Sequence, residues 1–287
     1  KLPSKRVRPL FTLLANSLYN SDHSFAIPAA LSNEMFHNFT LLHDDIMDSS
    51  KKRRGFETVH EKWNVNQAIL SGDSMLIMAT EFLDFYDSKI QKELLKLFNY
   101  TALEVCEGQQ LDIEFEKKTD IDFDDYIEMI TKKTSVLIAS SIKMGGIINQ
   151  LDSGELDILY DIGLNLGIAF QIQDDYLDLF GDEKIIGKKV GQDVVNNKKT
   201  ALHHLFVNTA SEAQLSKYYD YININDDDEK IEKIKSLFIR SDVERSLKKL
   251  VQEYSNNATS AIESLNPKFS KTSDLILLSE FLLKRNY

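Results

Sequence analysis

Apolar side chains recur every three or four residues along most of this sequence, and only four prolines and 11 glycines interrupt the pattern. Such spacing places side chains on one face of an α-helix, whereas a strand needs a spacing of two. No segment shows convincing two-residue alternation. The sequence therefore predicts an all-α protein, with long helices over residues 25–48, 66–86, 89–116, 123–144, 155–180 and 201–207 and shorter segments up to Arg285.

The predicted helices are separated by short breaks, which lie at Pro28, Gly55, Gly145/Gly146, Gly181, Gly187 and Gly191. None of them has the character of a domain linker, so we expect one helical domain over residues 1–287. The polar stretch Asn223–Glu229 is interpreted as a solvated loop or helix start.

Composition excludes several classes of protein. The 43% hydrophobic content can supply a substantial core, yet there is no apolar run of about 20 residues and no leader before Arg6. A single cysteine, Cys106, allows no internal disulfide and suits a reducing compartment. A net charge of −11 argues against a general nucleic-acid surface. We expect a soluble, cytoplasmic protein without stable membrane insertion.

A cluster of aspartates, Asp44-Asp45-Ile46-Met47-Asp48, ends the first long apolar helix. Residues four apart share a helix face, so Asp44 and Asp48 point the same way. Their mutual repulsion and the negative end of the helix dipole make this arrangement costly without a bound cation. The pattern therefore indicates a cation site.

The same pattern recurs in Asp174-Asp175-Tyr176-Leu177-Asp178, again after an apolar segment, where a merely solvated face is not expected. Mg²⁺ prefers oxygen ligands and is commonly held by one or two carboxylates together with phosphate oxygens. Arg53 and Arg54, just past the first cluster, provide forked donors for phosphate, and Lys5 and Arg8 offer a second anion clamp. Two such clusters predict a diphosphate bridged by several Mg²⁺ ions.

These motifs, in this order, resemble the trans-isoprenyl diphosphate synthases, or polyprenyl synthetases. The matching stretches cover nearly the whole chain: Lys5-Arg6-Val7-Arg8-Pro9, Leu42–Asp48 with Arg53-Arg54-Gly55, Gly72-Asp73, Gly108-Gln109, Lys133-Thr134, Phe170–Asp178, and Gly187-Lys188 with Lys198. The resemblance implies a bundle of about ten core helices around a deep pocket, a homodimer, and about three Mg²⁺ ions per active site.

The resemblance also implies roles for individual residues. Metal ligands would be Asp44, Asp48, Asp174 and, in support, Asp178. The allylic diphosphate would be contacted by Arg53, Lys133, Gln171 and Lys188, and isopentenyl diphosphate by Lys5, Arg8, His37 and Arg54. Thr134 and Lys198 would lie beside the reacting carbon.

The chain departs from the family pattern in two places. Pro3 and Ser4 replace the usual glycine pair before Lys5, and the helix expected before it is absent, so we expect a trimmed chain or a missing loop there. Beside Gly187, either Lys188 or Lys189 could face the phosphates.

The function expected from these features is head-to-tail condensation of isopentenyl diphosphate with an allylic diphosphate, through an allylic cation and without a nucleophilic residue. Two alternatives are a class I terpene cyclase, whose second metal motif usually contains Asn, Ser and Glu, and a non-catalytic synthase subunit, which need not keep both aspartate clusters. The symmetric second cluster and the second anion clamp favour the synthase.

Product length is predicted from positions before Asp44, because each helical residue descends about 1.5 Å from the metal site. Thr40 is small, and Phe39 and Phe36 are bulky enough to form part of a floor. This layout, with no insertion inside Asp44–Asp48, resembles the synthases that stop at geranylgeranyl diphosphate, which implies a C20 product, with C15 the alternative. Trp63, Phe82, Phe85 and Cys106 are interpreted as core residues.

Overall fold

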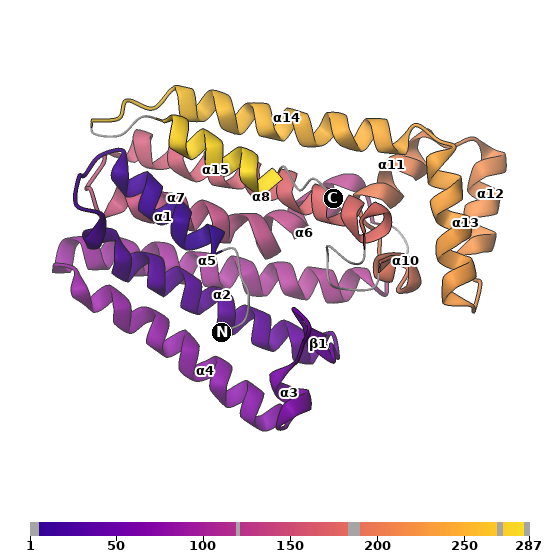
Figure 1. The fold of residues 1–287 in the computed structure, drawn as a ribbon, viewed down its shortest axis with the longest axis horizontal. Coiled ribbons are helices and arrows are strands. Elements are labelled where there is room, and N and C mark those ends of the chain that lie inside the picture. Colours follow the sequence, from indigo (N-terminus) through magenta and orange to yellow (C-terminus); the bar gives the residue numbers. More distant parts are fainter. Residues whose placement is uncertain (1–5, 119–120, 183–189, 269–271, 284–287) are drawn as a thin grey trace. The chain divides into compact units, whose positions relative to one another are not determined.

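The computed structural model describes residues 6–118, 121–182, 190–268 and 272–283. Apart from one short hairpin, the regular elements of these residues are helices (Figure 1). In chain order they are α1 Val7–Ser17, η1 His23–Ala26, α2 Ile27–Met47, β1 Lys52–Arg53, β2 Phe56–Glu57, α3 Val59–Lys62, α4 Val65–Glu81, η2 Phe82–Phe85, α5 Ser88–Phe115, α6 Phe123–Ile130, η3 Thr131–Ser135, α7 Val136–Ile147, α8 Ser153–Phe180, α10 Gln192–Val195, α11 Ala201–Thr209, α12 Glu212–Tyr221, α13 Asp227–Ile239, α14 Val243–Glu263 and α15 Ser273–Leu283.

The all-α prediction is confirmed, with four local corrections. Helix α1 was not predicted, and the two-stranded hairpin β1–β2 is the strand that periodicity missed. The helix predicted over residues 123–144 is divided into α6, a π-helical turn η3 and α7. Gly145 and Gly146 do not end a helix, because α7 continues to Ile147. A Cβ atom on Gly145 would lie 2.6 Å from the Cβ atom of Ala15, so this glycine serves close packing of α7 on α1.

The contacts within the chain define two compact units, and the prediction of a single domain stays a prediction. Unit 1 consists of Lys1–Leu103, Val136–Leu164 and Ala258–Leu282. Within it α2 packs along α4, and α1 packs along α7 (Figure 1). Pro28 lies in the first turn of α2, where its missing N–H has no helical partner to lose.

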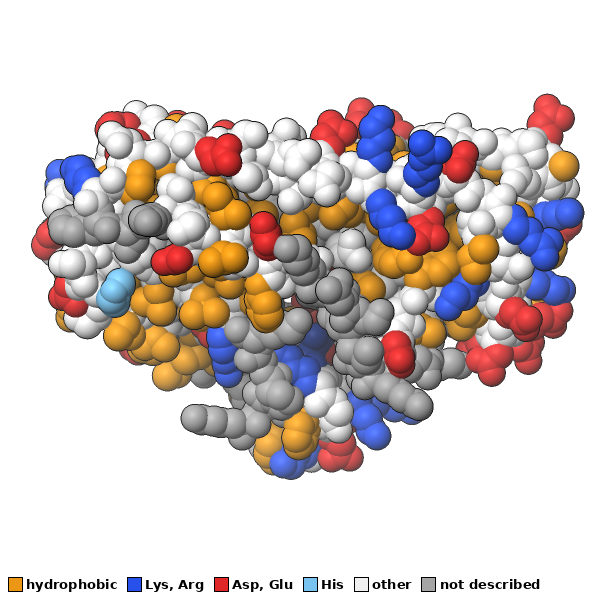
Figure 2. All heavy atoms as spheres, turned by 45° about the horizontal axis from the view of Figure 1, so that its top comes forward, with side chains coloured by type: hydrophobic (Ala, Val, Ile, Leu, Met, Phe, Trp, Pro, Cys, Tyr) orange, Lys and Arg blue, Asp and Glu red, His pale blue; other side chains and the backbone are white. Residues whose placement is uncertain are grey.

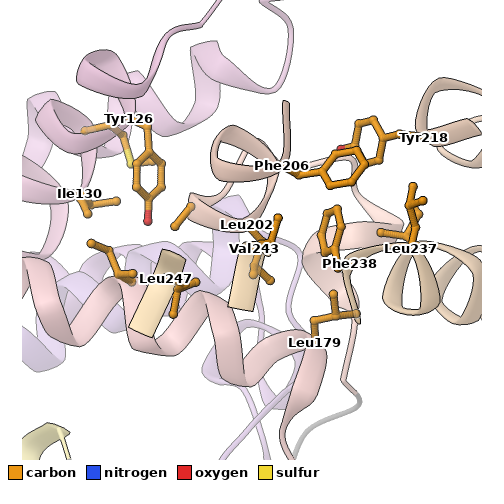
Figure 3. Close-up of a cluster of buried hydrophobic side chains, with 14 of the residues drawn as sticks. Tyr126, Ile130, Leu179, Leu202, Phe206, Tyr218, Leu237, Phe238, Val243 and Leu247 are labelled. Carbon is orange, nitrogen blue, oxygen red and sulfur yellow. The ribbon is translucent and has the colours of Figure 1, made fainter. Parts of the chain in front are cut away.

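Unit 2 consists of Glu104–Ser135, Asn165–Asn257 and Leu283–Tyr287. Its core contains aromatic and branched side chains from α6, α8 and α11–α14, among them Tyr126, Phe206, Tyr218 and Phe238 (Figure 3). Asp226 caps the first turn of α13, where its side chain accepts a hydrogen bond from the N–H of Glu229. The interpretation of this polar stretch as a helix start is thereby confirmed.

Three residues interpreted as core are in fact exposed: Trp63 is 58% and Phe85 62% exposed, and Cys106 is also exposed. Phe85 belongs to η2, a 3₁₀ turn at the end of α4, where three residues per turn replace 3.6 and rotate the apolar face. The indole of Trp63 instead lies under the ammonium group of Lys62, at 4.7 Å. None of the helices in the described part of the chain has both the length and the apolarity needed to cross a bilayer.

Candidate active site

The first aspartate cluster lies at the C-terminal end of α2, in unit 1. Asp48 caps the helix and its N–H donates to the carbonyl of Asp44 at 2.8 Å, so the two residues are one turn apart, as predicted. His43 packs against α4 at Gly72, where a Cβ atom would lie 2.4 Å from Nε2 of the imidazole. A larger residue at position 72 would displace this imidazole, so the glycine allows the end of α2 to pack closely on α4.

The middle aspartate of this cluster turns away from solvent. Asp45 is only 5% exposed, and its Oδ1 accepts a hydrogen bond from Nε of Arg53 at 2.7 Å. Burial raises the pKa of Asp45, while the guanidinium of Arg53 acts in the opposite direction. Asp45 therefore fixes the orientation of an arginine predicted to contact the allylic diphosphate.

The two predicted arginines sit on the hairpin that follows α2. Arg53 ends β1, and Arg54 and Gly55 form the two-residue turn before β2, with φ of 54° and 81°. A turn with two positive φ values matches the twist of a hairpin, and glycine adopts such a value without strain. The sequence Arg53-Arg54-Gly55 therefore forms a hairpin that presents neighbouring guanidinium groups.

Arginines also surround His37, in the middle of α2. Nη1 of Arg8 lies 3.1 Å from Nε2 of His37. Burial, followed by the charges of Arg8, Arg54, Arg53 and Arg6, holds the pKa of His37 well below its ordinary value. Burial likewise lowers the pKa of Arg8 to about 10, and Glu34 offsets it only in part. A cluster of cations around a neutral imidazole is a site suited to an anion.

In unit 2, Lys133 and Thr134 lie in the π-helical turn η3. Two glycines make room for it: a Cβ atom on Gly108 would lie 2.2 Å from the backbone N of Lys133, and one on Gly167 2.4 Å from Cα of Ser135. Single π-helical turns inside α-helices frequently occur at functional sites. The widened turn therefore contains two predicted site residues.

Asp112 is a site residue that sequence reasoning missed. Its Oδ2 lies 2.5 Å from Nζ of Lys133 and 3.8 Å from Nζ of Lys198. Burial raises the pKa of Asp112, but the two ammonium groups outweigh burial and bring the pKa below its ordinary value. Its position four residues after Gly108, one helical turn along α5, was the available signal.

The second aspartate cluster lies in the last turns of α8 and is held from within the unit. Asp175 is 5% exposed and accepts hydrogen bonds from the Tyr126 hydroxyl at 2.6 Å, the Ala201 N–H at 3.0 Å and Nε2 of Gln171 at 3.1 Å. Burial raises the pKa of Asp175 to about 6, against the lowering effect of these donors. Oε1 of Gln171 in turn accepts from the Thr134 hydroxyl at 3.1 Å.

The outer aspartates of this cluster differ from each other. Asp178 is 3% exposed, and its Oδ2 accepts a hydrogen bond from the N–H of Asp193 at 3.0 Å. Asp174 is half-buried. Of the two, Asp174 is the less buried, and the metal roles of both stay predictions.

A pocket in unit 2 brings together four predicted residues, Lys133, Thr134, Gln171 and Lys198, and adds Asp112 and Asp193 to them. Phe115, Met129 and Ile130 supply apolar lining. Asp44, Asp48, Arg8, His37, Arg53 and Arg54 belong to unit 1. Lys5 and Lys188 lie outside the described residues.

Comparison with known proteins agrees with this chemistry. The family model described as polyprenyl synthetase matches residues 1–239. The chain belongs to the polyprenyl synthetase family. It is 38% identical over 229 residues to a short chain isoprenyl diphosphate synthase of Methanocaldococcus jannaschii, a match that covers 79% of this chain and 70% of the relative.

Solved structures of the family have the same fold. A geranylgeranyl pyrophosphate synthase superposes with a TM-score of 0.95 at 42% identity, covering 100% of this chain and 89% of the other. A Corynebacterium glutamicum geranylgeranyl pyrophosphate synthase, in complex with isoprenyl diphosphate and magnesium, superposes with a TM-score of 0.89 at 25% identity, covering 99% and 87%.

The carboxylates of this polyprenyl synthetase are of the chemical type that binds Mg²⁺. Among the described residues, no group of three or more Asp, Glu, His or Cys side chains lies close enough to hold a metal ion by itself. Pairs such as Asp44 and Asp48 match the way Mg²⁺ binds, with one or two carboxylates, waters and substrate phosphate oxygens.

Proposed function

We propose that this polyprenyl synthetase is a Mg²⁺-dependent trans-prenyltransferase that condenses isopentenyl diphosphate head to tail with allylic diphosphates, giving a short-chain all-trans prenyl diphosphate. Support comes from family membership, from relatives named as isoprenyl and geranylgeranyl diphosphate synthases, and from the residues described above. In the family motifs that lie within the described residues, the side chains assigned to the reaction are present.

The observation that carries the proposal is the arginine cluster around His37. Two anions have to be bound, and the aspartate clusters can bind a diphosphate only through cations. Arg8, with His37 and Arg54, can bind a second diphosphate directly, and that diphosphate would relieve the unfavourable crowding of positive charge. A chain that used a single diphosphate would have no use for this cluster.

The aspartates then serve the allylic diphosphate. Asp44, Asp48 and Asp174, with Asp178 in support, would hold about three Mg²⁺ ions. Bound Mg²⁺ would neutralise the charge that develops on the leaving diphosphate. Arg53, oriented by Asp45, and Lys133, oriented by Asp112, are the donors assigned to this diphosphate. Lys188 is assigned to this diphosphate as well.

The reaction itself needs no nucleophilic side chain. The C1–O bond of the allylic substrate breaks and its electron pair leaves with the diphosphate. The double bond of isopentenyl diphosphate supplies the pair for the new carbon–carbon bond. A proton lost from the adjacent carbon restores an alkene, and the released diphosphate accepts it. The Thr134 hydroxyl, held by Gln171, and the Lys198 segment lie beside the cation in this scheme.

The proposal is tested by incubating the chain with Mg²⁺, isopentenyl diphosphate and dimethylallyl, geranyl or farnesyl diphosphate, with products identified by mass spectrometry. A prenyl diphosphate that appears only when both substrates are present supports the synthase. A hydrocarbon formed from the allylic diphosphate alone would identify a terpene cyclase. Activity only after addition of a partner chain would identify a modulating subunit.

We further propose a C20 product, with C15 the alternative. Thr40 lies one turn before Asp44, and its small side chain leaves room for the prenyl tail of the substrate. Phe39 and Phe36 precede Thr40 on α2 and lie further from the metal site. The Phe36 ring is 2% exposed and lies 5.6 Å from the Phe39 ring and 5.2 Å from the Phe98 ring, centroid to centroid. A linked group of rings at this depth would resist further elongation.

Replacing Phe39 with Ala should shift products to longer chains, and the double replacement with Phe36→Ala should shift them further. Loss of the buried Phe36 ring should also destabilise the protein by about 3–5 kcal/mol. Phe85→Ala is the matched control in the same unit, because its ring is 62% exposed. An unchanged product distribution in a folded double variant would assign product length to other helices.

We propose a homodimer as well. The α4–α5 region of unit 1 exposes large apolar side chains, among them Leu70 (65%), Ile77 (63%) and Leu103 (66%). Apolar groups so exposed are typical of interaction surfaces. Ile77→Asp should shift the sedimentation coefficient from dimer to monomer, and a wild-type chain that sediments as a monomer would refute the assignment.

A further inference from the structure

The short helix α10 is held at both ends by adjacent side chains of one other helix, α13. At its start, a Cβ atom on Gly191 would lie 2.8 Å from Cδ1 of Ile231, so the backbone meets that side chain directly. At its end, Nζ of Lys230 donates a hydrogen bond to the carbonyl of Val195 at 3.1 Å. Residues 230 and 231 therefore fix α10 from one side.

Lys230 is unusual among the lysines of α13. It is 4% exposed, and burial lowers the pKa of its ammonium group. Lys233, three residues further along, is 43% exposed and pairs with Glu229 at 2.6 Å. Figure 2 shows many charged side chains on the surface of the α12–α13 region, where such groups are normally found. A buried ammonium group costs free energy unless it is hydrogen-bonded. The hydrogen bond to the Val195 carbonyl therefore ties the side chain of Lys230 to the end of α10.

The backbone that Lys230 holds is also bonded to predicted site residues. The N–H groups of Gly191 and Asp193 donate to the carbonyl and to Oδ2 of Asp178, at 2.5 and 3.0 Å. The N–H of Lys198 donates to the carbonyl of Asp193 at 2.8 Å. Helix α10 thus connects the end of the second aspartate cluster to Lys198.

We propose that Lys230 is a positioning residue for the reaction, acting through α10 on Lys198 and Asp178. No family motif described above includes it. The inference rests on the proposed function for its kinetic part only. If Lys230 is removed, α10 loses the contact at its end, and the backbone that carries Lys198 moves relative to Asp112 and the pocket.

The test compares Lys230→Met with Lys233→Met in the full chain. Lys230→Met keeps the length of the side chain but removes its donor, and kcat per folded molecule should fall about ten- to a hundredfold, as expected when reacting groups are displaced by about 1 Å. The KM for isopentenyl diphosphate should stay unchanged, because its proposed ligands are in unit 1. Lys230→Arg, which keeps a donor, should recover part of kcat, and Lys233→Met should behave as wild type.

A second readout does not depend on activity. Hydrogen exchange of the Asp193 and Lys198 amides should accelerate in Lys230→Met and not in Lys233→Met. If the wild-type chain makes no prenyl diphosphate, the proposed function fails, and exchange alone decides whether Lys230 holds α10.

Two results would overturn the inference: wild-type kcat per folded molecule in Lys230→Met with only a lower melting temperature, or unchanged exchange of these amides. If Lys230→Met does not fold, Gly191→Ala replaces it, because its Cβ atom displaces the start of α10 from Ile231. Wild-type kcat in that variant would equally reject the proposal.

Discussion

The aspartate clusters of α2 and α8 differ in how their carboxylates are surrounded. In the first, Asp48 is exposed, and the buried Asp45 is hydrogen-bonded to the partly exposed side chain of Arg53. In the second, Asp175 accepts three hydrogen bonds and Asp178 accepts one from the backbone of Asp193. One spacing of aspartates therefore occurs in two environments.

The two clusters therefore differ in proposed role: the first serves mainly ligand binding, and the second also holds helices of the protein together. The first cluster contains one exposed carboxylate, Asp48, and is followed by the guanidinium groups of Arg53 and Arg54, so a cation can reach it from solvent. The second cluster is largely balanced by the protein, and its middle aspartate connects α6, α8 and the start of α11 through Tyr126, Gln171 and Ala201. Asp174 in this cluster is half-buried.

The largest effect is expected from removing the outward carboxylate of either cluster. Asp44→Ala or Asp174→Ala should lower kcat by about three orders of magnitude or more, because each removes a ligand needed mainly in the transition state. Steady-state kinetics at saturating Mg²⁺ measures this effect, and circular dichroism verifies that each variant is folded. Near-normal turnover in either variant would contradict the metal-site assignment.

The middle aspartates should differ in stability. Asp175→Ala leaves the Tyr126 hydroxyl and the Ala201 N–H buried without an acceptor, at a cost of about 1–3 kcal/mol for each group. Asp45→Ala releases only Arg53, whose side chain is 33% exposed and can be hydrated, so the loss should be below about 1 kcal/mol. Urea unfolding of both variants measures the difference. Equal losses would mean that the two clusters are supported alike.

Much of the fold was predictable, because helical periodicity is a local property. The helices α2, α5 and α8 agree with prediction within a few residues, and so does the placement of both aspartate clusters on them. Periodicity does not reveal where a helix changes its pitch. The π-helical turn η3 and the 3₁₀ turn η2 were therefore missed, and with them the exposure of Phe85.

Site residues could be predicted where they belong to a recurring sequence motif. They could not be predicted where they are defined by contacts with residues distant in sequence. Asp112 meets Lys133 and Lys198 across 21 and 86 residues of sequence, and Lys230 meets Val195 across 35. Each is a charged residue on a helix, a residue type that is normally exposed to solvent. Tertiary contacts distinguish both residues from their exposed neighbours, and only Asp112 also had a sequence signal, its spacing of four residues from Gly108.

A smaller effect is expected from exchanging one cation for another in unit 1. Arg54→Lys should raise the KM for isopentenyl diphosphate about tenfold and the KM for the allylic substrate less, because an ammonium group cannot replace a bidentate fork. Arg54 also adopts a positive φ in the hairpin turn, so melting temperature is measured as a control. Equal changes in both KM values would show that the two diphosphate sites are misassigned.

The smallest effect concerns the dependence of stability on pH. The pKa of His37 is held well below its ordinary value by burial and by the surrounding arginines, so the folded protein does not take up a proton that the unfolded chain binds below about pH 6.5. Stability contributed by this group is therefore complete above that pH. It should be lost as pH falls, by up to about 1.4 kcal/mol per pH unit.

A partly buried histidine of unit 2, His203, can be compared with His37. Burial lowers the pKa of His203 to about 4, with smaller effects of His204 and Lys199, so His203→Gln should also reduce the acid sensitivity of unfolding. Only the His37 effect should respond to a diphosphate, because an anion bound among Arg8 and Arg54 removes the repulsion that disfavours the imidazolium. Urea unfolding between pH 5 and 7, with and without inorganic pyrophosphate, measures both effects. If pyrophosphate changes the slope in His37→Gln as much as in the wild type, the arginine cluster around His37 is not the anion site, and the assignment of the second substrate to unit 1 loses its main support.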